Sequence, residues 1–125
     1  SGQVSCWGAN SNGQLGDGTT TRRTTPVVVG GASPIGDATA LAVSGYGACV
    51  VRADRTVWCW GRNEYGQLGD GTIDDECTAH AIAGLTNIKA IAAGRHHALA
   101  LTEGGAVFAW GENERGQPAL TTGVR

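Results

Sequence analysis

One segment recurs almost three times along this chain. It reads Cys-Trp-Gly-Ala-Asn-Ser-Asn-Gly-Gln-Leu-Gly-Asp-Gly-Thr over residues 6–19, returns with few changes over residues 59–72, and shortens to Trp-Gly-Glu-Asn-Glu-Arg-Gly-Gln over residues 110–117. Its tryptophans, Trp7, Trp60 and Trp110, follow one another at intervals of 53 and 50 residues. A fixed period of roughly this length is typical of supersecondary units that share a core with their neighbours. The sequence therefore predicts a repeat protein.

The residues between the copies predict short antiparallel strands. In the first complete unit, apolar runs lie at 38–43, 48–51 and 56–60, with a turn at 53–55. The next unit repeats this order at 87–93, 97–101 and 106–110, and runs at 25–29 and 79–83 supply outer strands. The runs are rich in β-branched and aromatic residues and partly alternate, whereas helical periodicity is absent. About four strands in ~50 residues match one blade of a β-propeller.

We therefore expect an all-β chain of propeller blades, each made of four antiparallel strands. The 125 residues supply about two blades and one extra strand in a single repeat region, 1–125, with repeat boundaries near 7–59, 60–109 and 110–125. A hydrophobic content of 41% is enough for a core, and 21 glycines suit many tight turns. The prediction is a partial propeller, or a subunit that other chains complete.

The repeated block also resembles a known family. Trp-Gly-x-Asn-x-x-Gly-Gln-Leu-Gly-Asp-Gly-Thr, followed by Thr-Pro-Val, is similar to the repeat of the regulator of chromosome condensation family, which also occurs in many bacterial secreted or surface proteins. The resemblance covers nearly the whole chain and implies a seven-bladed propeller of about 350 residues in complete members. It suggests a bacterial-type member of the family.

Residues that recur at equivalent positions are expected to be structural. We expect the three tryptophans to pack between blades, with their indole N–H groups bonded to backbone. The aspartates are expected to cap their turns through backbone amides. The recurring set is Trp7, Trp60, Trp110, Gly8, Gly61, Gly111, Asp17 and Asp70.

The chain is expected to begin inside a blade. Val4–Trp7 corresponds to the second half of a hairpin whose first half would precede residue 1. Such a strand presents unpaired backbone groups that attract another strand. We therefore expect either a fragment of a longer protein or a subunit that associates with its own copies through open strand edges.

Two of the four cysteines predict a disulfide. Cys49 and Cys59 fall on opposite arms of one predicted hairpin, and the next unit, aligned with one extra residue in its turn, has Ala98 and Ala109 there. Joint loss of both thiols favours a cross-strand disulfide over two buried free cysteines. A disulfide indicates an extracellular, periplasmic or cell-surface location, with the cytoplasm left open. The pairing of Cys6 and Cys77 stays open.

The sequence predicts no metal, cofactor or catalytic residue. There is no Cys-x-x-Cys pair, and His96 and His97 are adjacent, which on a strand sends them to opposite faces. The loop 70–76 lacks the spacing of a calcium loop, and the loop 13–18 lacks the ending of a phosphate-binding loop. An acid–base site built from His96, His97 and the acids of loop 70–76 is the enzymatic alternative, but no spacing specifies its geometry.

The charge and hydropathy of the chain exclude two classes of partner. A formal net charge of −2 and a pI near 5.8 leave no basic footprint for nucleic acid. No run approaches the ~20 apolar residues that a membrane-spanning helix needs. We therefore expect neither nucleic-acid binding nor membrane insertion.

The leading hypothesis is a non-enzymatic module that recognises another protein, whose identity the sequence leaves open. Functional residues collect in the loops of a rigid scaffold, and Tyr and Arg are enriched at interfaces. A structural component that assembles into rings or fibres is one alternative. An inhibitor similar to the β-lactamase-inhibiting propellers of the family is the other, whereas the acidic pI disfavours the branch that acts on a GTPase at chromatin. The candidate partner-binding residues are Tyr46, Tyr65, Arg95 and His96, with Arg62 and Glu64 as secondary candidates.

Overall fold

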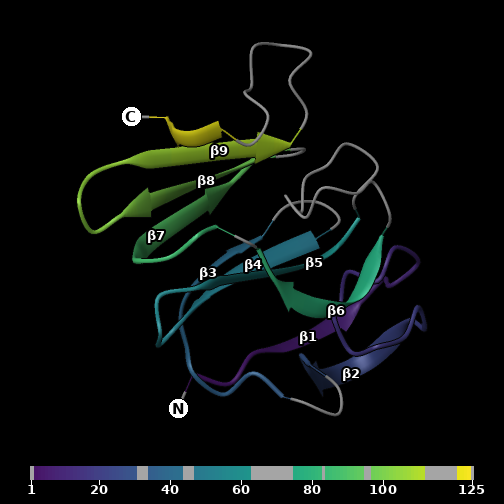
Figure 1. The fold of residues 1–125 in the computed structure, drawn as a ribbon. Coiled ribbons are helices and arrows are strands. Elements are labelled where there is room, and N and C mark those ends of the chain that lie inside the picture. Colours follow the sequence, from purple (N-terminus) through teal and green to yellow (C-terminus); the bar gives the residue numbers. More distant parts are fainter. Residues whose placement is uncertain are drawn as a thin grey trace.

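The computed structural model describes residues 2–30, 34–43, 47–62, 75–82, 84–94, 97–111 and 121–124 (Figure 1). Every regular element in these ranges is a β-strand. The strands are β1 (Ser5–Gly8), β2 (Arg23–Val28), β3 (Ala38–Val43), β4 (Gly47–Arg52), β5 (Val57–Gly61), β6 (Glu76–Ala81), β7 (Ile88–Ala93), β8 (His97–Thr102), β9 (Val107–Gly111) and β10 (Thr121–Val124).

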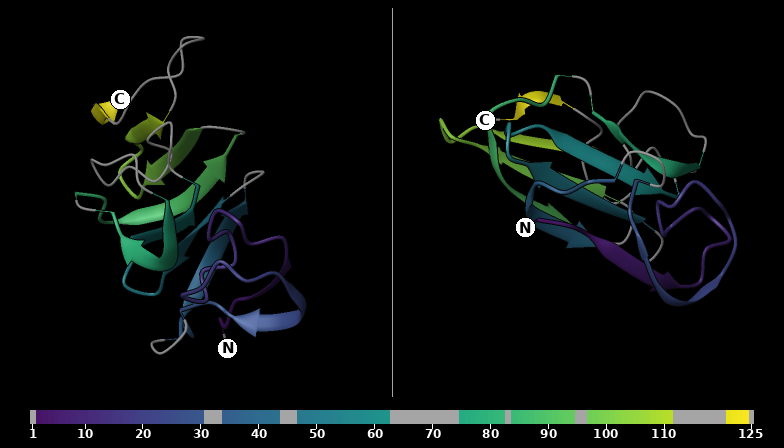
Figure 2. Two further views of the ribbon diagram at one scale, coloured as in Figure 1. Left: turned by 90° about the vertical axis from the view of Figure 1, so that its right-hand side faces the viewer. Right: turned by 90° about the horizontal axis from the view of Figure 1, so that it is seen from below.

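The strands form three antiparallel sheets that follow one another along the chain. The middle sheet has the order β3-β4-β5-β6, the last has the order β10-β9-β8-β7, and the first described sheet is the pair β1-β2. Figures 1 and 2 show these sheets in succession, from the purple β1–β2 pair through the teal sheet to the yellow-green one. Sequential four-stranded sheets packed in this way are propeller blades. The predicted all-β partial propeller is confirmed.

The two complete blades share one strand register. β3 pairs with β4 from Ala38↔Arg52 to Val43↔Ala48, and β7 pairs with β8 from Ile88↔Thr102 to Ala93↔Ala98, each with an irregularity after the first pair. Adding 50 to both residue numbers of each pair in the second blade gives the corresponding pair in the third blade. The two hairpin turns therefore have equal length, and the extra residue that the sequence alignment placed in the turn of the third blade was wrong. The counterpart of Cys49 is consequently Leu99, which pairs with Ala109, and not Ala98.

The glycine after each tryptophan lets the outer strand join its sheet. Gly8 pairs with Arg23 and Gly61 with Glu76, each beyond a break in regular register. The φ angles of Gly8 and Gly61 are 112° and 108°, in the region that side chains with a Cβ rarely enter. β2 and β6 therefore begin earlier than the predicted 25–29 and 79–83. The strand β10, paired with β9, had no counterpart in the prediction.

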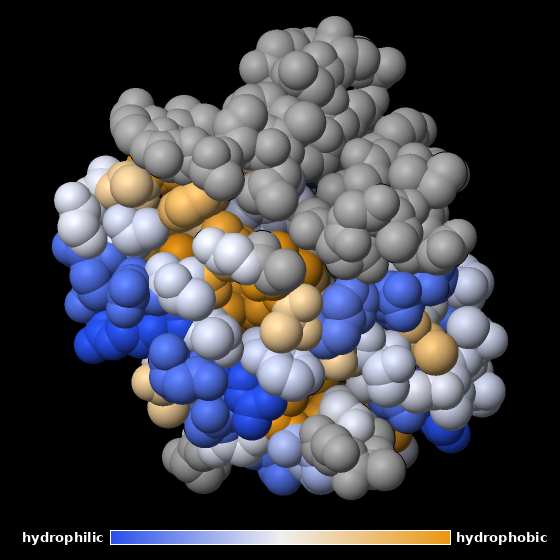
Figure 3. Space-filling view, viewed as in Figure 1, coloured by the Kyte–Doolittle hydropathy of each residue, from blue (hydrophilic) through white to orange (hydrophobic). Residues whose placement is uncertain are grey.

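Apolar side chains form one core cluster at each junction between blades. The cluster between the second and third blades contains Val51, Val57, Ile88 and Trp110, all of them at most 1% exposed. The cluster between the first and second contains Val4, Val29, Val50 and Trp60. In Figure 3, apolar side chains show through between hydrophilic ones that cover much of the visible surface. Each blade is thus stabilised by burying its faces against neighbouring blades.

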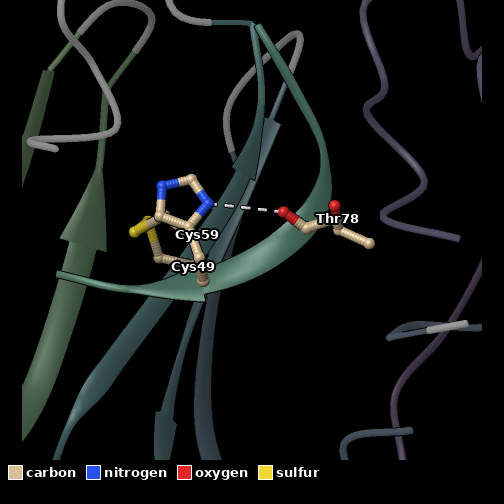
Figure 4. The surroundings of a disulfide bond; sticks show 4 residues. Cys49, Cys59 and Thr78 are labelled. Atoms are coloured by element: carbon tan, nitrogen blue, oxygen red, sulfur yellow. Dashed lines mark hydrogen bonds between the residues drawn. A yellow bond between two sulfur atoms is a disulfide. The ribbon is translucent and has the colours of Figure 1, made fainter. Parts of the chain in front are cut away.

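A disulfide lies inside the cluster between the second and third blades. Cys49 and Cys59 are directly paired across β4 and β5, and their Sγ atoms are bonded with a Cα–Cα distance of 4.1 Å. Cys59 also pairs with His80 on β6. The Nδ1 atom of His80 lies 3.4 Å from the backbone oxygen of Thr78 (Figure 4). The bridge therefore crosses the middle of the second blade.

The three equivalent tryptophans do not share one environment. Trp60 and Trp110 are 0% and 1% exposed, as expected of residues between blades, whereas Trp7 is 62% exposed. The Trp60 indole donates a hydrogen bond of 2.9 Å to the backbone oxygen of Gln14, in the preceding unit. No described unit precedes Trp7 to cover it in the same way. The expectation of burial was therefore wrong for Trp7.

We predict that Gly16→Ala destabilises the fold more than Gly18→Ala. Both glycines have positive φ, at 65° and 85°, so each alanine costs about 1 kcal/mol in backbone strain. A Cβ at Gly16 would also lie 2.8 Å from the Trp60 ring, whereas one at Gly18 meets nothing closer than 3.8 Å. Overpacking against a buried ring adds roughly 1–3 kcal/mol. Urea unfolding of both variants checks this, and equal losses would contradict it.

Candidate functional site

An open apolar groove of about 470 Å³ lies between the first and second blades. It has β1 on one side, the turn after β1 at one end, and β3 with the start of β4 on the other side. Among the described residues that line it, no side chain carries a carboxylate, guanidinium or ammonium group. The lining residues are Val4, Ser5, Cys6, Trp7, Ala9, Gln14, Leu15, Leu41, Val43, Gly47 and Ala48.

One edge of β1 faces this groove without a strand partner in the described chain. β1 pairs on its other edge with β2, where Val29 N donates to Val4 O at 2.9 Å and Cys6 pairs with Val27. Because hydrogen-bonding direction alternates along a strand, Ser5 and Trp7 direct their backbone N–H and C=O groups to the opposite edge. The groove therefore offers main-chain donors and acceptors as well as apolar surface.

The opposite side of the groove is a sheet face with large exposed apolar side chains. Leu41 and Val43 on β3 are 53% and 63% exposed. They pair with Val50 and Ala48 on β4, so all four side chains share one face. Val50 and Ala48 are buried against the first blade, but Leu41 and Val43 extend beyond it. An exposed apolar face beside an open strand edge is typical of a protein-binding surface.

A buried polar cluster fixes the turn at the end of the groove. Asn10 is 1% exposed; its side-chain amide donates to the oxygens of Thr19 and Thr21 at 2.9 and 3.0 Å, and its Oδ1 accepts from Leu15 N at 3.0 Å. Asp17 accepts from the backbone N of Thr19 at 3.0 Å and from Arg23 Nε at 3.0 Å. The repeated Asn and Asp thus hold the Gly-Gln-Leu-Gly turn in place.

These hydrogen bonds shift the ionisation of Asp17. Burial opposes the charged carboxylate, but hydrogen bonds from Thr19, Arg23 and Asn10 outweigh it and hold the pKa of Asp17 below its ordinary value. The pKa of the nearby Cys6 thiol is raised, first by burial and then by the negative charge of Asp17. Asp17 is thus a charged structural residue, and Cys6 remains a protonated thiol at neutral pH.

Family models match this chain over both complete repeats. One model of the regulator of chromosome condensation (RCC1) repeat matches residues 1–51 and 54–101, and a second matches residues 38–67 and 88–117. Together with the blade geometry, these matches decide the family. The chain belongs to the RCC1 repeat family.

Curated relatives include much longer RCC1-repeat proteins. The chain is 32% identical to the human E3 ubiquitin-protein ligase HERC2 over 123 residues, which cover 93% of this chain and 2% of HERC2. It is 47% identical to human protein RCC2 over 73 residues, or 57% of this chain and 14% of RCC2. This RCC1-repeat chain therefore spans a small part of each of these relatives.

Solved structures share the fold of this RCC1-repeat chain. Human WBSCR16 aligns with a TM-score of 0.77 at 23% identity, over 95% of this chain and 33% of the other. Prp20p from Saccharomyces cerevisiae aligns with a TM-score of 0.72 at 24% identity, over 98% of this chain and 31% of the other. At these identities the likeness shows the fold alone.

The loop residues predicted to bind a partner lie mostly outside the described residues. Tyr46, Tyr65, Glu64, Arg95 and His96 fall there, as does the repeat residue Asp70, so their roles stay predictions. Arg62 is described and lies directly after β5, half-buried, and it takes part in an interaction within the protein.

The groove was only partly visible in the sequence. An unpaired edge at Val4–Trp7 was predicted, because this segment matches the second half of a hairpin in the next unit. Leu41 and Val43 were assigned to a strand, but their exposure was missed. The sequence signal for this surface was the alternation of alanine with larger residues over 38–43. Because side chains alternate between the two faces of a strand, this pattern places the larger apolar side chains of β3 on one face and its alanines on the other.

Other candidate chemistry leaves no assembled centre in the described part of the chain. Cys6 and Cys77 are free thiols, and no group of three or more metal-ligating side chains occurs among the described residues. His97 begins β8, and its Nδ1 is buried without a hydrogen-bond partner among the described residues. Within the same ranges, no helix is long and apolar enough to span a membrane.

We predict that Asp17→Asn destabilises the protein at neutral pH and less so in acid. The substitution weakens charge-assisted hydrogen bonds, for a loss of about 1–2 kcal/mol. Because the folded pKa of Asp17 is lowered, its contribution is complete above the pKa of unfolded aspartate and is lost as pH falls through the folded pKa.

Urea unfolding of both proteins from neutral to acidic pH checks this prediction. Glu103→Gln, which removes a more exposed carboxylate paired with Arg55, serves as the control and should change stability little. A constant difference between wild type and Asp17→Asn across the pH range would contradict the assignment.

Proposed function

We propose that this chain is a non-enzymatic protein-recognition module built on RCC1-type propeller blades. The observation that carries the proposal is the apolar groove beside β1, where a strand edge without a partner among the described residues meets the exposed side chains of Leu41 and Val43. Backbone donors and acceptors beside apolar surface suit a polypeptide ligand. A small charged substrate would find no complementary charge among the described residues of this lining.

The nature of the partner is supported by what related proteins bind. In one solved structure, Kap60 is bound to yeast RCC1 (Prp20). The Prp20p of Saccharomyces cerevisiae has binding properties towards Gsp1p and histones. These partners belong to those proteins and not to this chain. They support the more general proposal that its blades and loops contact another protein. A net charge of −2 gives no support to nucleic acid as a direct partner.

We further propose that this module works in an oxidising compartment, as a secreted or surface-exposed protein of bacterial type. The Cys49–Cys59 bridge supports the compartment, because such bonds persist outside the reducing cytosol. The bacterial assignment rests on the resemblance of the repeated block alone. Intact mass of the natively produced protein, with and without reductant, tests the redox state on which the compartment depends.

We predict that loop substitutions weaken the binding of a specific partner from the producing organism. The test protein combines Tyr46→Ala, Tyr65→Ala and Arg95→Ala, because aromatic and arginine side chains dominate interface energies. Lys89→Ala, at an exposed position on β7, is the control. Immobilised wild type and control should retain one saturable partner after crosslinking, and the triple variant should weaken its binding at least about tenfold.

Circular dichroism should show that all three proteins are folded. Equal retention by the wild type and the triple variant would contradict the loop assignment. Growth of the chain alone into larger species with rising concentration, without any foreign partner, would favour the structural alternative over recognition.

A further inference from the structure

We propose that the junction between the second and third blades is a redox-sensitive switch, closed while the Cys49–Cys59 bond is intact and loosened when a dithiol reduces that bond. One thiolate of the dithiol bonds to one cysteine sulfur, and the other cysteine leaves. The second thiol then closes the reductant into a cyclic disulfide and frees the first cysteine, so two electrons and two protons pass to the protein. The switch belongs to the scaffold and does not depend on the proposed recognition of a partner.

The third blade covers the bond. Cys59 is 0% exposed and Cys49 is 6% exposed. Both cysteines belong to the core cluster to which the third blade contributes Ile88, Ala98 and Trp110, and β7 of that blade contacts β4 of the second. Exchange with a disulfide requires the attacking thiolate to reach a sulfur atom. A dissolved dithiol therefore reaches this bond when the third blade moves away from the second.

The packing around the two sulfur atoms favours the bonded state. Sulfur atoms that are not bonded to each other stay about 3.5 Å or more apart, so two thiols need more room than a disulfide. β4 and β5 are the central strands of their sheet and pair with strands on both edges, which fixes their spacing. The added volume is therefore directed at the buried side chains of the cluster, among them Ile88 of the third blade.

The coupling between the bond and the junction works in both directions. If the closed junction packs better around a disulfide than around two thiols, closure makes the bond harder to reduce. By thermodynamic linkage, reduction then favours the open junction by the same factor. The bond and the packing of the third blade thus stabilise each other.

The junction between the first and second blades provides an internal comparison. Its core cluster lies on the other face of the second blade, contains Ile35 and Trp60, and includes no disulfide among the described residues. The third blade carries Leu99 and Ala109 at the positions that correspond to Cys49 and Cys59. The redox response should therefore be confined to one side of the second blade.

The first measurement follows reduction of the folded 125-residue chain by dithiothreitol, in wild type and in two matched variants. Leu85 and Ile35 each lie three residues before the first paired residue of the next inner strand, and both are at most 2% exposed, in the second and first junction respectively. Leu85→Ala should speed reduction by about tenfold or more, because a cavity at this junction favours its opening. Ile35→Ala should stay within about threefold of wild type.

Alkylation followed by intact mass gives the rate. An intact bond leaves Cys6 and Cys77 to be labelled, whereas a reduced chain is labelled at four cysteines. Wild type unfolded in urea supplies the reference rate for an accessible bond, and folded wild type should react at least about tenfold more slowly. Circular dichroism checks the folding of each variant.

The second measurement follows amide hydrogen exchange in wild type before and after reduction. Ile88 N donates to Arg55 O at 3.0 Å across the second junction, and Ile35 N donates to Val29 O at 3.1 Å at the first. Reduction should speed exchange at Ile88 by about tenfold or more and leave Ile35 within about threefold. The variant Cys49→Leu/Cys59→Ala, which copies the third blade, is the control and should not respond to dithiothreitol.

Four results would overturn the switch. Reduction of folded wild type as fast as in urea would show that the third blade does not shield the bond. Equal acceleration by Leu85→Ala and Ile35→Ala, or equal loss of protection at Ile88 and Ile35, would show that the whole chain unfolds and not one junction. Unchanged exchange at Ile88 after reduction would show that the bond does not hold the junction closed. A response of the bond-free control would assign the effect to Cys6 or Cys77.

Discussion

The hydrogen bond from the Trp60 indole to the backbone oxygen of Gln14 joins one repeat to the one before it. The repeated block is therefore used across a boundary, since the tryptophan of one copy needs the Gly-Gln-Leu-Gly turn of another. Gly16 lacks a side chain at the point where a Cβ would meet the Trp60 ring. Asn10 and Asp17 fix the conformation of this Gly-Gln-Leu-Gly turn by accepting hydrogen bonds from backbone amides. Because each copy completes its neighbour, no single repeat buries its own faces.

This mutual dependence explains why the first described sheet differs from the other two. The tryptophan of the second unit is buried against a preceding turn, but Trp7 is 62% exposed, and the β1 edge and the β3 face beside it are open. The residues exposed there are the same kinds that pack between blades elsewhere in the chain. The groove is thus packing surface of the repeat that no described unit covers.

The sequence predicted the strands and the blades well because both depend on local pattern and on the period. The hairpins at 38–60 and 87–110 were located within a residue or two of β3–β5 and β7–β9. Exposure was harder to predict, because the burial of Trp7 depends on a neighbouring unit and not on its own residues. The equivalence of Cys49 and Leu99 could be established only from the observed strand pairings of the two blades. At the candidate groove, β1 repeats the sequence of β5, but its side chains are packed differently, because Trp7 is exposed whereas Trp60 is buried.

Hydrogen exchange of the indole N–H protons tests the shared-boundary account most directly. If each buried indole is held between neighbouring units, the protons of Trp60 and Trp110 exchange slowly, whereas that of Trp7 exchanges as fast as in a short peptide. Assigned two-dimensional NMR spectra of the 125-residue chain distinguish the four indoles. Slow exchange confined to Trp60 and Trp110 among the three equivalent positions is the predicted result. Equal exchange at Trp7, Trp60 and Trp110 would contradict the account.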